Sequence, residues 1–379
     1  MKRLVLAVIL ILGSFIFVFG DKEIIIGREE GDSMLIYPQQ VEEGPDGNIY
    51  VYDLADAFIK VYSPEGKFLR KIGGKGQGPG EIQRPDGVSF GFTPDEKLFF
   101  TEFIRGHPWI TFMELSGEFS KVLKFEIKEL FGVSRAVSLR DGSFLAKLSF
   151  PGRPEKRKDY FFYSSPQELV ILDSEGRVIS RIIKTSYFTR ISYIGDGADS
   201  PLPFTPRFLW CPFKNNTVIF ADGLSTRLKV YAYKGKLIKE IDTPLSEPEK
   251  VTKNDLDEWR EERKRGFRDK AWYNRFGRVI EKYKKSIYEK RPNLDRISLT
   301  PEGNILISGL WDDEVQKINH WLLDENGNAL AKIGAEFSYL VISKHFIFYR
   351  ITDKVENILI NCLKRTGTEK EDLLRLEKK

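Results

Sequence analysis

The sequence predicts an all-β protein built from six repeated units of short antiparallel strands, and two patterns carry this prediction. In the first, a turn of small or polar residues precedes an apolar strand, as in PDGNIYVYD (Pro45–Asp53). In the second, another turn leads into another strand, as in SPEGKFLRKI (Ser63–Ile72). The first pattern occupies residues 45–53, 94–102, 140–148, 214–222, 301–309 and 343–351, and the second 63–72, 115–125, 173–182, 233–241 and 324–333. Units this short cannot bury their own apolar faces, so neighbouring units must stack.

The spacing of the units predicts a six-bladed β-propeller of four-stranded antiparallel blades. Three of the steps between successive first turns are 42–49 residues long, which is the length of one blade. The other two steps, of 74 and 87 residues, require insertions. A ring of small sheets accommodates a long chain as one domain because each blade packs only on its neighbours. Residues 21–379 are therefore expected to form a single propeller.

The two ends of the chain are expected to close this ring together. The sixth unit lacks the second pattern, whereas KEIIIG (Lys22–Gly27) is a strand with no unit of its own. The N-terminal strand is therefore predicted to be the outer strand of the last blade, which removes an open sheet edge.

One segment carries a family resemblance. FLRKIGGKGQGPGEIQRPDGVSF (Phe68–Phe90) resembles an NHL repeat, whose glycines let the chain cross from the outer strand of one blade to the inner strand of the next. The other five units keep the strand rhythm without this Gly-rich crossing. The whole chain resembles exported six-bladed propeller proteins, most of which have no assigned activity, so the resemblance implies a fold and names no ligand.

The N-terminus predicts export. Met1–Gly20 has a basic start and an apolar run, which is typical of a secretory signal cleaved after Gly20. The expected location is periplasmic or extracellular. The alternative is an uncleaved membrane anchor, although the apolar run is short of the roughly 20 residues that a span needs. Cys211 and Cys362 fall in blades four and six and are expected to be separate buried thiols, without CxxC partners for a metal or redox site.

A helical insertion is predicted between blades four and five, at residues 248–291. This segment holds 15 Lys and Arg against 9 Asp and Glu. Thr252 and Asp255 resemble a helix-start capping pair. Further along, apolar residues recur at helical spacing: Trp272, Phe276, Val279, Ile280, Tyr283 and Ile287. The helix is expected to lie flat on the propeller. The alternatives are a lid over the channel, or a docking surface for a partner or an acidic membrane.

Recognised catalytic and cofactor patterns do not occur in the sequence. Its three histidines, His107, His320 and His345, are not at metal-ligand spacing, and there is no GxSxG nucleophile elbow. The GGKG segment (Gly73–Gly76) lacks phosphate-loop spacing. The expectation is therefore a protein without a catalytic site, cofactor or metal. Nucleic-acid binding is excluded because an exported chain with one basic segment lacks the interleaved basic motifs it requires.

The candidate ligand-binding residues lie in loops between the second and third strands, which gather at one mouth of a propeller channel. They are Asp53, Arg105, His107, Asp222, Arg227, Trp311 and Asp312. The alternative is that each acid only caps its own turn. Two long segments near blade four, Phe150–Ser165 and Thr185–Pro206, are expected to be loops that add to a binding surface.

These observations favour an exported binding or interaction module for a protein, peptide or carbohydrate. One alternative is a metal-dependent enzyme like the lactonases and lyases that other six-bladed propellers support. The other is a structural subunit of a cell-envelope complex. Membrane contact is expected only through an uncleaved N-terminal segment or the basic insertion.

Overall fold

A computed structural model of the protein describes residues 23–104, 109–125, 127–157, 160–193, 199–266, 289–312, 317–337, 339–352 and 358–377. The predicted signal segment and most of the second half of the insertion lie outside these residues. Within them, no helix is both long and apolar enough to cross a bilayer.

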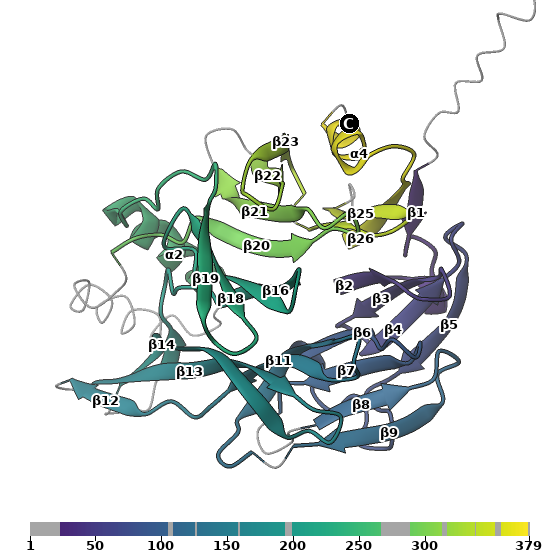
Figure 1. The fold of residues 1–379 in the computed structure, drawn as a ribbon, viewed down its shortest axis with the longest axis horizontal. Helices are drawn as coiled ribbons and strands as arrows, with labels where there is room; N and C mark the ends of the chain where they lie inside the picture. Colours follow the sequence, from purple (N-terminus) through teal and green to yellow (C-terminus); the bar gives the residue numbers. More distant parts are fainter. Residues whose placement is uncertain are drawn as a thin grey trace, which may run out of the picture.

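The described chain forms six antiparallel sheets that follow one another around a centre in sequence order (Figure 1). The first sheet contains β2 (Pro38–Glu43), β3 (Ile49–Asp53), β4 (Phe58–Tyr62) and β5 (Phe68–Gly73), and the second β6 (Val88–Phe92), β7 (Leu98–Glu102), β8 (Trp109–Met113) and β9 (Phe119–Lys124). The third contains β10 (Gly132–Ser138), β11 (Phe144–Ser149), β13 (Tyr160–Leu172) and β14 (Val178–Tyr193), extended by β12 (Pro154–Arg157) and β15 (Asp199–Pro201).

The second half of the ring repeats this order. The fourth sheet contains β16 (Leu209–Phe213), β17 (Thr217–Ala221), β18 (Arg227–Ala232) and β19 (Leu237–Asp242), and the fifth β20 (Leu294–Leu299), β21 (Ile305–Asp312), β22 (Lys317–Leu323) and β23 (Ala329–Ala335). The sixth contains β24 (Leu340–Ile342), β25 (Phe346–Thr352), β26 (Ile358–Lys364) and β1 (Ile24–Ile26). Short 3₁₀ turns, η1 (Gly31–Ser33) and η2 (Pro85–Gly87), precede the first two sheets. The chain is thus all-β with a propeller arrangement.

The repeated turns are tight hairpins that depend on glycine. Between β4 and β5, the amide of Ser63 donates to the carbonyl of Lys67, and that of Gly66 donates to Ser63, both at 2.8 Å. Gly66 has a φ of 84°, a left-handed conformation that glycine adopts without steric cost. This geometry explains why the second pattern of the sequence carries glycine at this point.

The core consists of six apolar clusters, each between two neighbouring sheets. Alternate residues of one strand serve the two sides: Tyr50 and Tyr52 of β3 pack toward the second sheet, whereas Ile49 and Val51 pack toward the sixth. The whole of β3 is therefore buried. Such strands read as continuous apolar runs rather than as alternating ones.

The predicted closure of the ring is confirmed. Strand β1 pairs antiparallel with β26, with Ile24 opposite Cys362 and Ile26 opposite Ile360. Ile26 is fully buried in the cluster between the sixth and first sheets. Cys211 and Cys362 lie in the fourth and sixth sheets as free, buried thiols, also as expected.

The two long segments expected to be loops are largely strand, so that expectation was wrong. Most of Phe150–Ser165 and Thr185–Pro206 belongs to β12–β15, which continue the third sheet beyond the ring. The extended part of the third sheet contains aromatic and β-branched residues, such as Phe162 and Ile191, which favour strands. Pairing between the strands also satisfies backbone N–H and C=O groups that a loop would leave to water. The Gly and Pro residues around these strands favour loops locally, but the pairing between the strands outweighs that preference.

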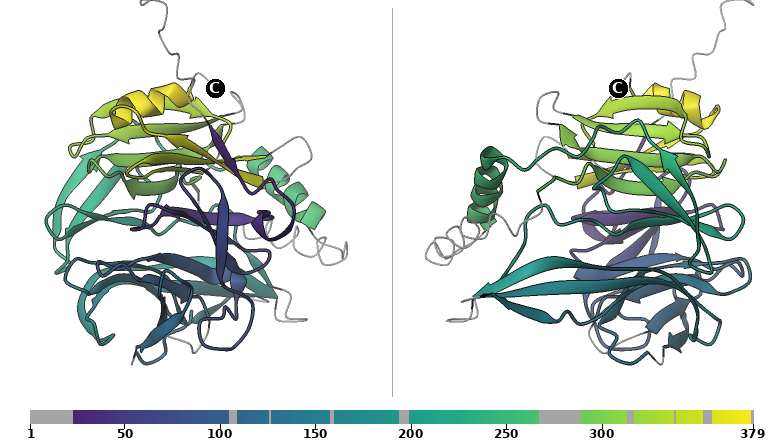
Figure 2. Two further views of the ribbon diagram at one scale, coloured as in Figure 1. Left: turned by 90° about the vertical axis from the view of Figure 1, so that its right-hand side faces the viewer. Right: turned by 60° about the vertical axis from the view of Figure 1, so that its left-hand side comes forward.

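Part of the helical insertion is described. Helix α2 (Lys253–Gly266) begins at the predicted capping pair, where the amide of Thr252 donates to Asp255 at 2.6 Å and that of Asp255 to Thr252 Oγ1 at 3.2 Å. Leu256 of α2 packs in a cluster with Phe162 and Ile191 of the extended third sheet. Figure 2 shows α2 beside the outer ends of these strands rather than over a blade. The amphipathic face predicted at Trp272–Ile287 lies outside the described residues.

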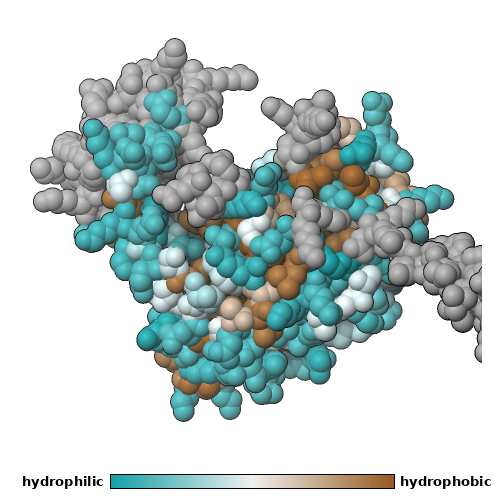
Figure 3. All heavy atoms as spheres, turned by 90° about the horizontal axis from the view of Figure 1, so that it is seen from above, coloured by the Kyte–Doolittle hydropathy of each residue, from teal (hydrophilic) through white to brown (hydrophobic). Residues whose placement is uncertain are grey.

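A C-terminal helix, α4 (Glu369–Leu376), was not predicted. Its start is a capping box between Thr368 and Glu371, a spacing that the sequence displays. Leu373 and Leu376 pack into the cluster between the fifth and sixth sheets. Seen from above the view of Figure 1, the surface of the molecule is mainly hydrophilic with scattered apolar residues (Figure 3).

Replacing Ile26 by Ala should strongly destabilise the protein, because it opens a cavity where the ring closes. We expect a loss of roughly 2–5 kcal/mol in the free energy of unfolding, measured by urea denaturation. The control is Ile179→Ala on β14, where the side chain is 61% exposed and the change should stay within about 0.5 kcal/mol. Equal effects of the two substitutions would contradict this role of β1.

Candidate functional site: the central channel

The innermost strands of the six sheets enclose a central channel with a volume of about 940 Å³. Its walls are formed by β2, β6, β10, β16, β20 and β24, together with the turns that follow several of them. These strands have a neighbouring strand on one side only. Their inward residues therefore face the channel, and alternate residues point into the clusters between the sheets.

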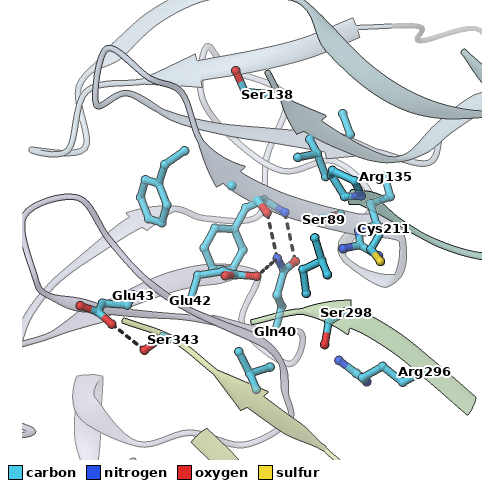
Figure 4. Close-up of a pocket in the computed structure, with 18 of the residues that line it drawn as sticks. Gln40, Glu42, Glu43, Ser89, Arg135, Ser138, Cys211, Arg296, Ser298 and Ser343 are labelled. Atoms are coloured by element: carbon cyan, nitrogen blue, oxygen red, sulfur yellow. Dashed lines mark hydrogen bonds between the residues drawn. The ribbon is translucent and has the colours of Figure 1, made fainter. Parts of the chain in front are cut away.

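Polar side chains occupy the inward positions of several inner strands. On β2, Gln40 and Glu42 line the channel, whereas Val41 between them is fully buried in the core. On β20, Arg296 and Ser298 flank the buried Ile297 in the same way. Figure 4 shows Glu42, Arg135 and Arg296 reaching the channel from three different sheets.

Gln40 fixes the position of the Glu42 carboxyl group. Its Nε2 donates to Glu42 Oε1 at 3.1 Å and to the carbonyl of Phe90 at 2.8 Å, and its Oε1 accepts from the amide of Phe90 at 3.1 Å. Burial raises the pKa of Glu42 above its usual range. The hydrogen bond from Gln40 and the positive charges of Arg135 and Arg296 oppose this shift without cancelling it.

Two arginines face the channel against aromatic rings. The Arg135 guanidinium lies 5.0 Å from the centre of the Trp210 ring, and its Nη1 donates to the carbonyl of Trp210 at 3.3 Å. The Arg296 guanidinium lies 4.1 Å from the centre of the Tyr339 ring, and the Tyr339 hydroxyl accepts from the amide of Val41 at 3.0 Å. Attraction between a cation and a ring face helps to hold each guanidinium in place.

Neither arginine forms an ion pair with a carboxylate of the described chain. Nε of Arg296 is buried and has no hydrogen-bond partner among the described residues. Arg135 has surface exposed to the channel, yet protein surrounds that space. Desolvation therefore lowers its pKa, with Arg296 acting in the same direction and Glu42 against it.

A third cation lies beside this pair. Lys147 of β11 is directly opposite Arg135 in the strand register and also lines the channel. Its Nζ lies 5.3 Å from the centre of the Phe208 ring. Burial, followed by the charge of Arg135, lowers the pKa of Lys147 to about 8. The middle of the channel thus has more cationic than anionic groups.

The acids at the two ends of the channel are already paired. Glu43 accepts from Ser343 Oγ at 2.5 Å and from the amide of His345 at 3.0 Å, and its other oxygen contacts the His345 ring. Asp295 forms an ion pair with Arg207. These carboxylates therefore do not neutralise the arginines in the middle of the channel.

The residues predicted from the sequence lie elsewhere, and none that is fully described lines the channel. The buried carboxylate of Asp53 accepts from the amides of Ile36 and Tyr37 at 2.8 and 2.7 Å and pairs with Lys60 at 3.0 Å. Only the contact with the amide of Ala55, at 3.3 Å, is of the kind that the turn-capping alternative describes, because the other partners lie outside the turn that follows Asp53.

Two more of the predicted residues, Asp222 and Arg227, have described contacts, and neither contacts another predicted residue. Asp222 accepts from the amide of Leu224 at 2.9 Å, and Arg227 pairs with Asp242 and Glu240. Arg105 and His107 lie outside the described residues. Trp311 and Asp312 end β21, and their side chains are not among those described. A role for these seven residues in ligand binding stays a prediction.

Sequence reasoning missed the channel residues, although a signal was present. In the segments PQQVEE, GVSRAVS and LDRISL, charged or amide residues interrupt a strand expected to be innermost. A polar residue alternating with buried apolar ones in such a strand has to point into the channel. Among the described residues, no three His, Cys, Asp or Glu side chains form a group that could hold a metal ion.

Comparisons with known proteins agree with the fold. The DUF5128 family model, described as a 6-bladed beta-propeller, matches residues 29–89, which contain the first sheet and the entry into the second. No curated protein matches the chain. The NHL resemblance finds no match of its own, and the propeller assignment is the part supported.

Solved structures of propeller proteins are similar in outline. A proposed exported protein of Bacteroides fragilis is 12% identical, with 92% of this chain and 97% of that chain covered at a TM-score of 0.49. Virginiamycin B lyase of Staphylococcus aureus is 11% identical, with 91% and 99% covered at 0.46. A gluconolactonase of Xanthomonas campestris is 11% identical, with 87% of each chain covered at 0.44. Likeness at this level transfers no substrate or mechanism to this chain.

Replacing Glu42 by Gln should stabilise the protein increasingly as the pH rises. The folded-state pKa of Glu42 lies above its unfolded-state value, so its stabilising contribution is complete below about pH 4.5 and is lost as the pH rises through the folded-state pKa. Glutamine does not ionise and avoids this loss. Urea denaturation at about pH 4 and about pH 8 measures the difference.

The control for this titration is Glu371→Gln. Hydrogen bonds from Thr368 lower the pKa of Glu371, so its contribution is present at high pH and is lost as the pH falls. This variant should lose more stability at the higher pH. The same pH trend in both variants would contradict the assignment of a raised pKa to Glu42.

Proposed function

We propose that this protein is an exported binding module that holds a small polar ligand in its central channel. The observation that carries the proposal is the channel itself. Its volume of about 940 Å³ lies in the range of small-molecule sites, and charged or amide groups converge in it from separate sheets. A channel of this size suits a small molecule or the tip of a peptide, and it is too small for a folded partner.

The chemistry of the lining favours binding over metal-dependent catalysis. A lactonase-like or lyase-like centre requires several carboxylates, amides or imidazoles converging on one ion. The middle of this channel instead presents Arg135, Arg296 and Lys147 around a single carboxyl group, Glu42. Three cationic side chains in one site repel a metal ion and attract an anion or a group with several hydrogen-bond acceptors.

Two further parts of the proposal rest on the sequence. The basic and apolar segment Met1–Gly20 supports export to the periplasm or the cell exterior. The loops that follow the second strands, with Arg105, His107, Trp311 and Asp312, are proposed as the rim of the channel at the end where the first strands begin.

Filling the channel should abolish ligand binding. Ser298 lines the channel on β20, and Ser298→Trp places a large ring there. The control, Ser116→Trp, makes the same change in an exposed turn between β8 and β9. Thermal shift and native mass spectrometry would be run with a panel of neutral sugars, short peptides and organic acids.

We expect a panel member to bind the natural protein and Ser116→Trp but not Ser298→Trp. Binding that survives in Ser298→Trp, or a panel without any binder, would overturn the channel proposal. Hydrolysis of a lactone that depends on an added divalent ion and is lost in Ser298→Trp would favour the enzyme alternative instead.

A further inference from the structure

The centre of the channel holds positive charge that the described protein does not neutralise. Arg135 and Arg296 approach from β10 and β20 and repel each other. Desolvated charges are costly unless they are paired, and other arginines such as Arg207 and Arg365 are paired with carboxylates. The two channel arginines have no carboxylate partner of this kind among the described residues, which leaves them able to take one from a ligand.

The two guanidiniums are already oriented for such a partner. The Trp210 and Tyr339 rings help to hold the two guanidiniums in place, with ring centres 5.0 and 4.1 Å from the guanidinium carbons. Nη1 of Arg135 donates to the carbonyl of Trp210, Arg296 is hydrogen-bonded to Tyr339, and the Nε of Arg296 is buried without a partner among the described residues, so a ligand would use the remaining N–H groups. A planar oxyanion matches the fork geometry of guanidinium N–H groups.

We infer that the ligand of the channel carries a carboxylate, and that Arg135 and Arg296 bind this carboxylate together. The inference rests on the proposed binding function of the channel and specifies the chemistry of its ligand. Glu42 is within electrostatic reach of both arginines, and in its neutral form it adds a hydrogen-bond donor for the same anion.

The arginine pair and its acid suit a singly charged carboxylate. When Glu42 is ionised it offsets one of the two guanidiniums, so this group of three side chains has about one positive charge to neutralise. Lys147, held over Phe208, raises the total along the wall to about two positive charges, so a phosphate dianion would also balance the charge, and the binding test decides between the two anions.

The test uses matched ligands that differ only at the acidic group. The probes are glucuronate with glucose, and N-acetyl-leucine with its amide; glucose 6-phosphate adds a phosphate. Binding is measured by calorimetry to the natural protein and to Arg135→Gln, Arg296→Gln, Arg296→Lys and Ser298→Trp. The control Arg177→Gln removes an exposed arginine that is paired with Asp173 outside the channel.

We expect at least one acid to bind while its neutral partner binds at least tenfold more weakly. Arg135→Gln and Arg296→Gln should each weaken binding of the acid by at least tenfold, which is the effect of losing one charge-assisted contact. Arg296→Lys keeps the charge without the planar fork and should fall between Arg296→Gln and the natural protein. Arg177→Gln should bind as the natural protein does.

The variants also have an expected effect without ligand, so a folding failure is recognised. Removing one of the two cations relieves their repulsion but also loses its contact with Trp210 or Tyr339, so each Gln variant should change the melting temperature of the free protein only slightly. A fall of more than about 5 °C in both would show that the arginines are structural and would overturn the inference.

The possible outcomes distinguish failure of the carboxylate inference from failure of the proposed binding function. If neutral sugars or the amide bind and only Ser298→Trp abolishes that binding, the channel binds ligands and the carboxylate inference is wrong. Tighter binding of glucose 6-phosphate than of glucuronate would also overturn it. If none of the probes binds the natural protein, the proposed function fails together with the inference.

Discussion

The structure depends on one constraint: each sheet must bury both of its faces against neighbours. A four-stranded sheet of this kind is apolar on both sides, and no sheet is stable in water alone. The six clusters satisfy the constraint pairwise, but only if the sixth sheet also meets the first. Strand β1 completes the sixth sheet from the other end of the chain, so the first described strand and the last are held by the same cluster. The ring is therefore one cooperative unit.

The same constraint creates the channel. The innermost strands converge on the axis, and their inward residues have no sheet to pack against. Those positions are thus released from the apolar requirement that governs the rest of each strand. Gln40, Glu42, Arg135 and Arg296 occupy them, each next to a residue that is committed to the core. Rigid strands on several blades hold these polar groups, which is the arrangement that a preorganised binding site needs.

The repeat could be predicted from the sequence because hairpin turns and buried strands depend on residues that are neighbours in the chain. Gly66 and its equivalents mark the turns, and apolar runs such as Ile49–Val51 mark strands buried on both faces. The extension of the third sheet could not be predicted in this way, because Phe162 and Ile191 pack against Leu256, which lies 94 and 65 residues further along in a helix. The site was missed for a similar reason. Arg135 and Arg296 are more than 150 residues apart, and only the closed ring brings them to one channel.

The two arginines without carboxylate partners make the centre of the ring less stable than it could be. Apolar or neutral residues at these inward positions would remove the repulsion and the desolvation of two guanidiniums. Six apolar clusters stabilise the ring and can offset such a cost, and strain or unfavourable charge in proteins concentrates where a ligand is bound. The aromatic rings of Trp210 and Tyr339 reduce the cost without neutralising the charge, because a ring face attracts a cation but accepts no strong hydrogen bond. An anion entering the channel would meet two guanidiniums that are already held in place.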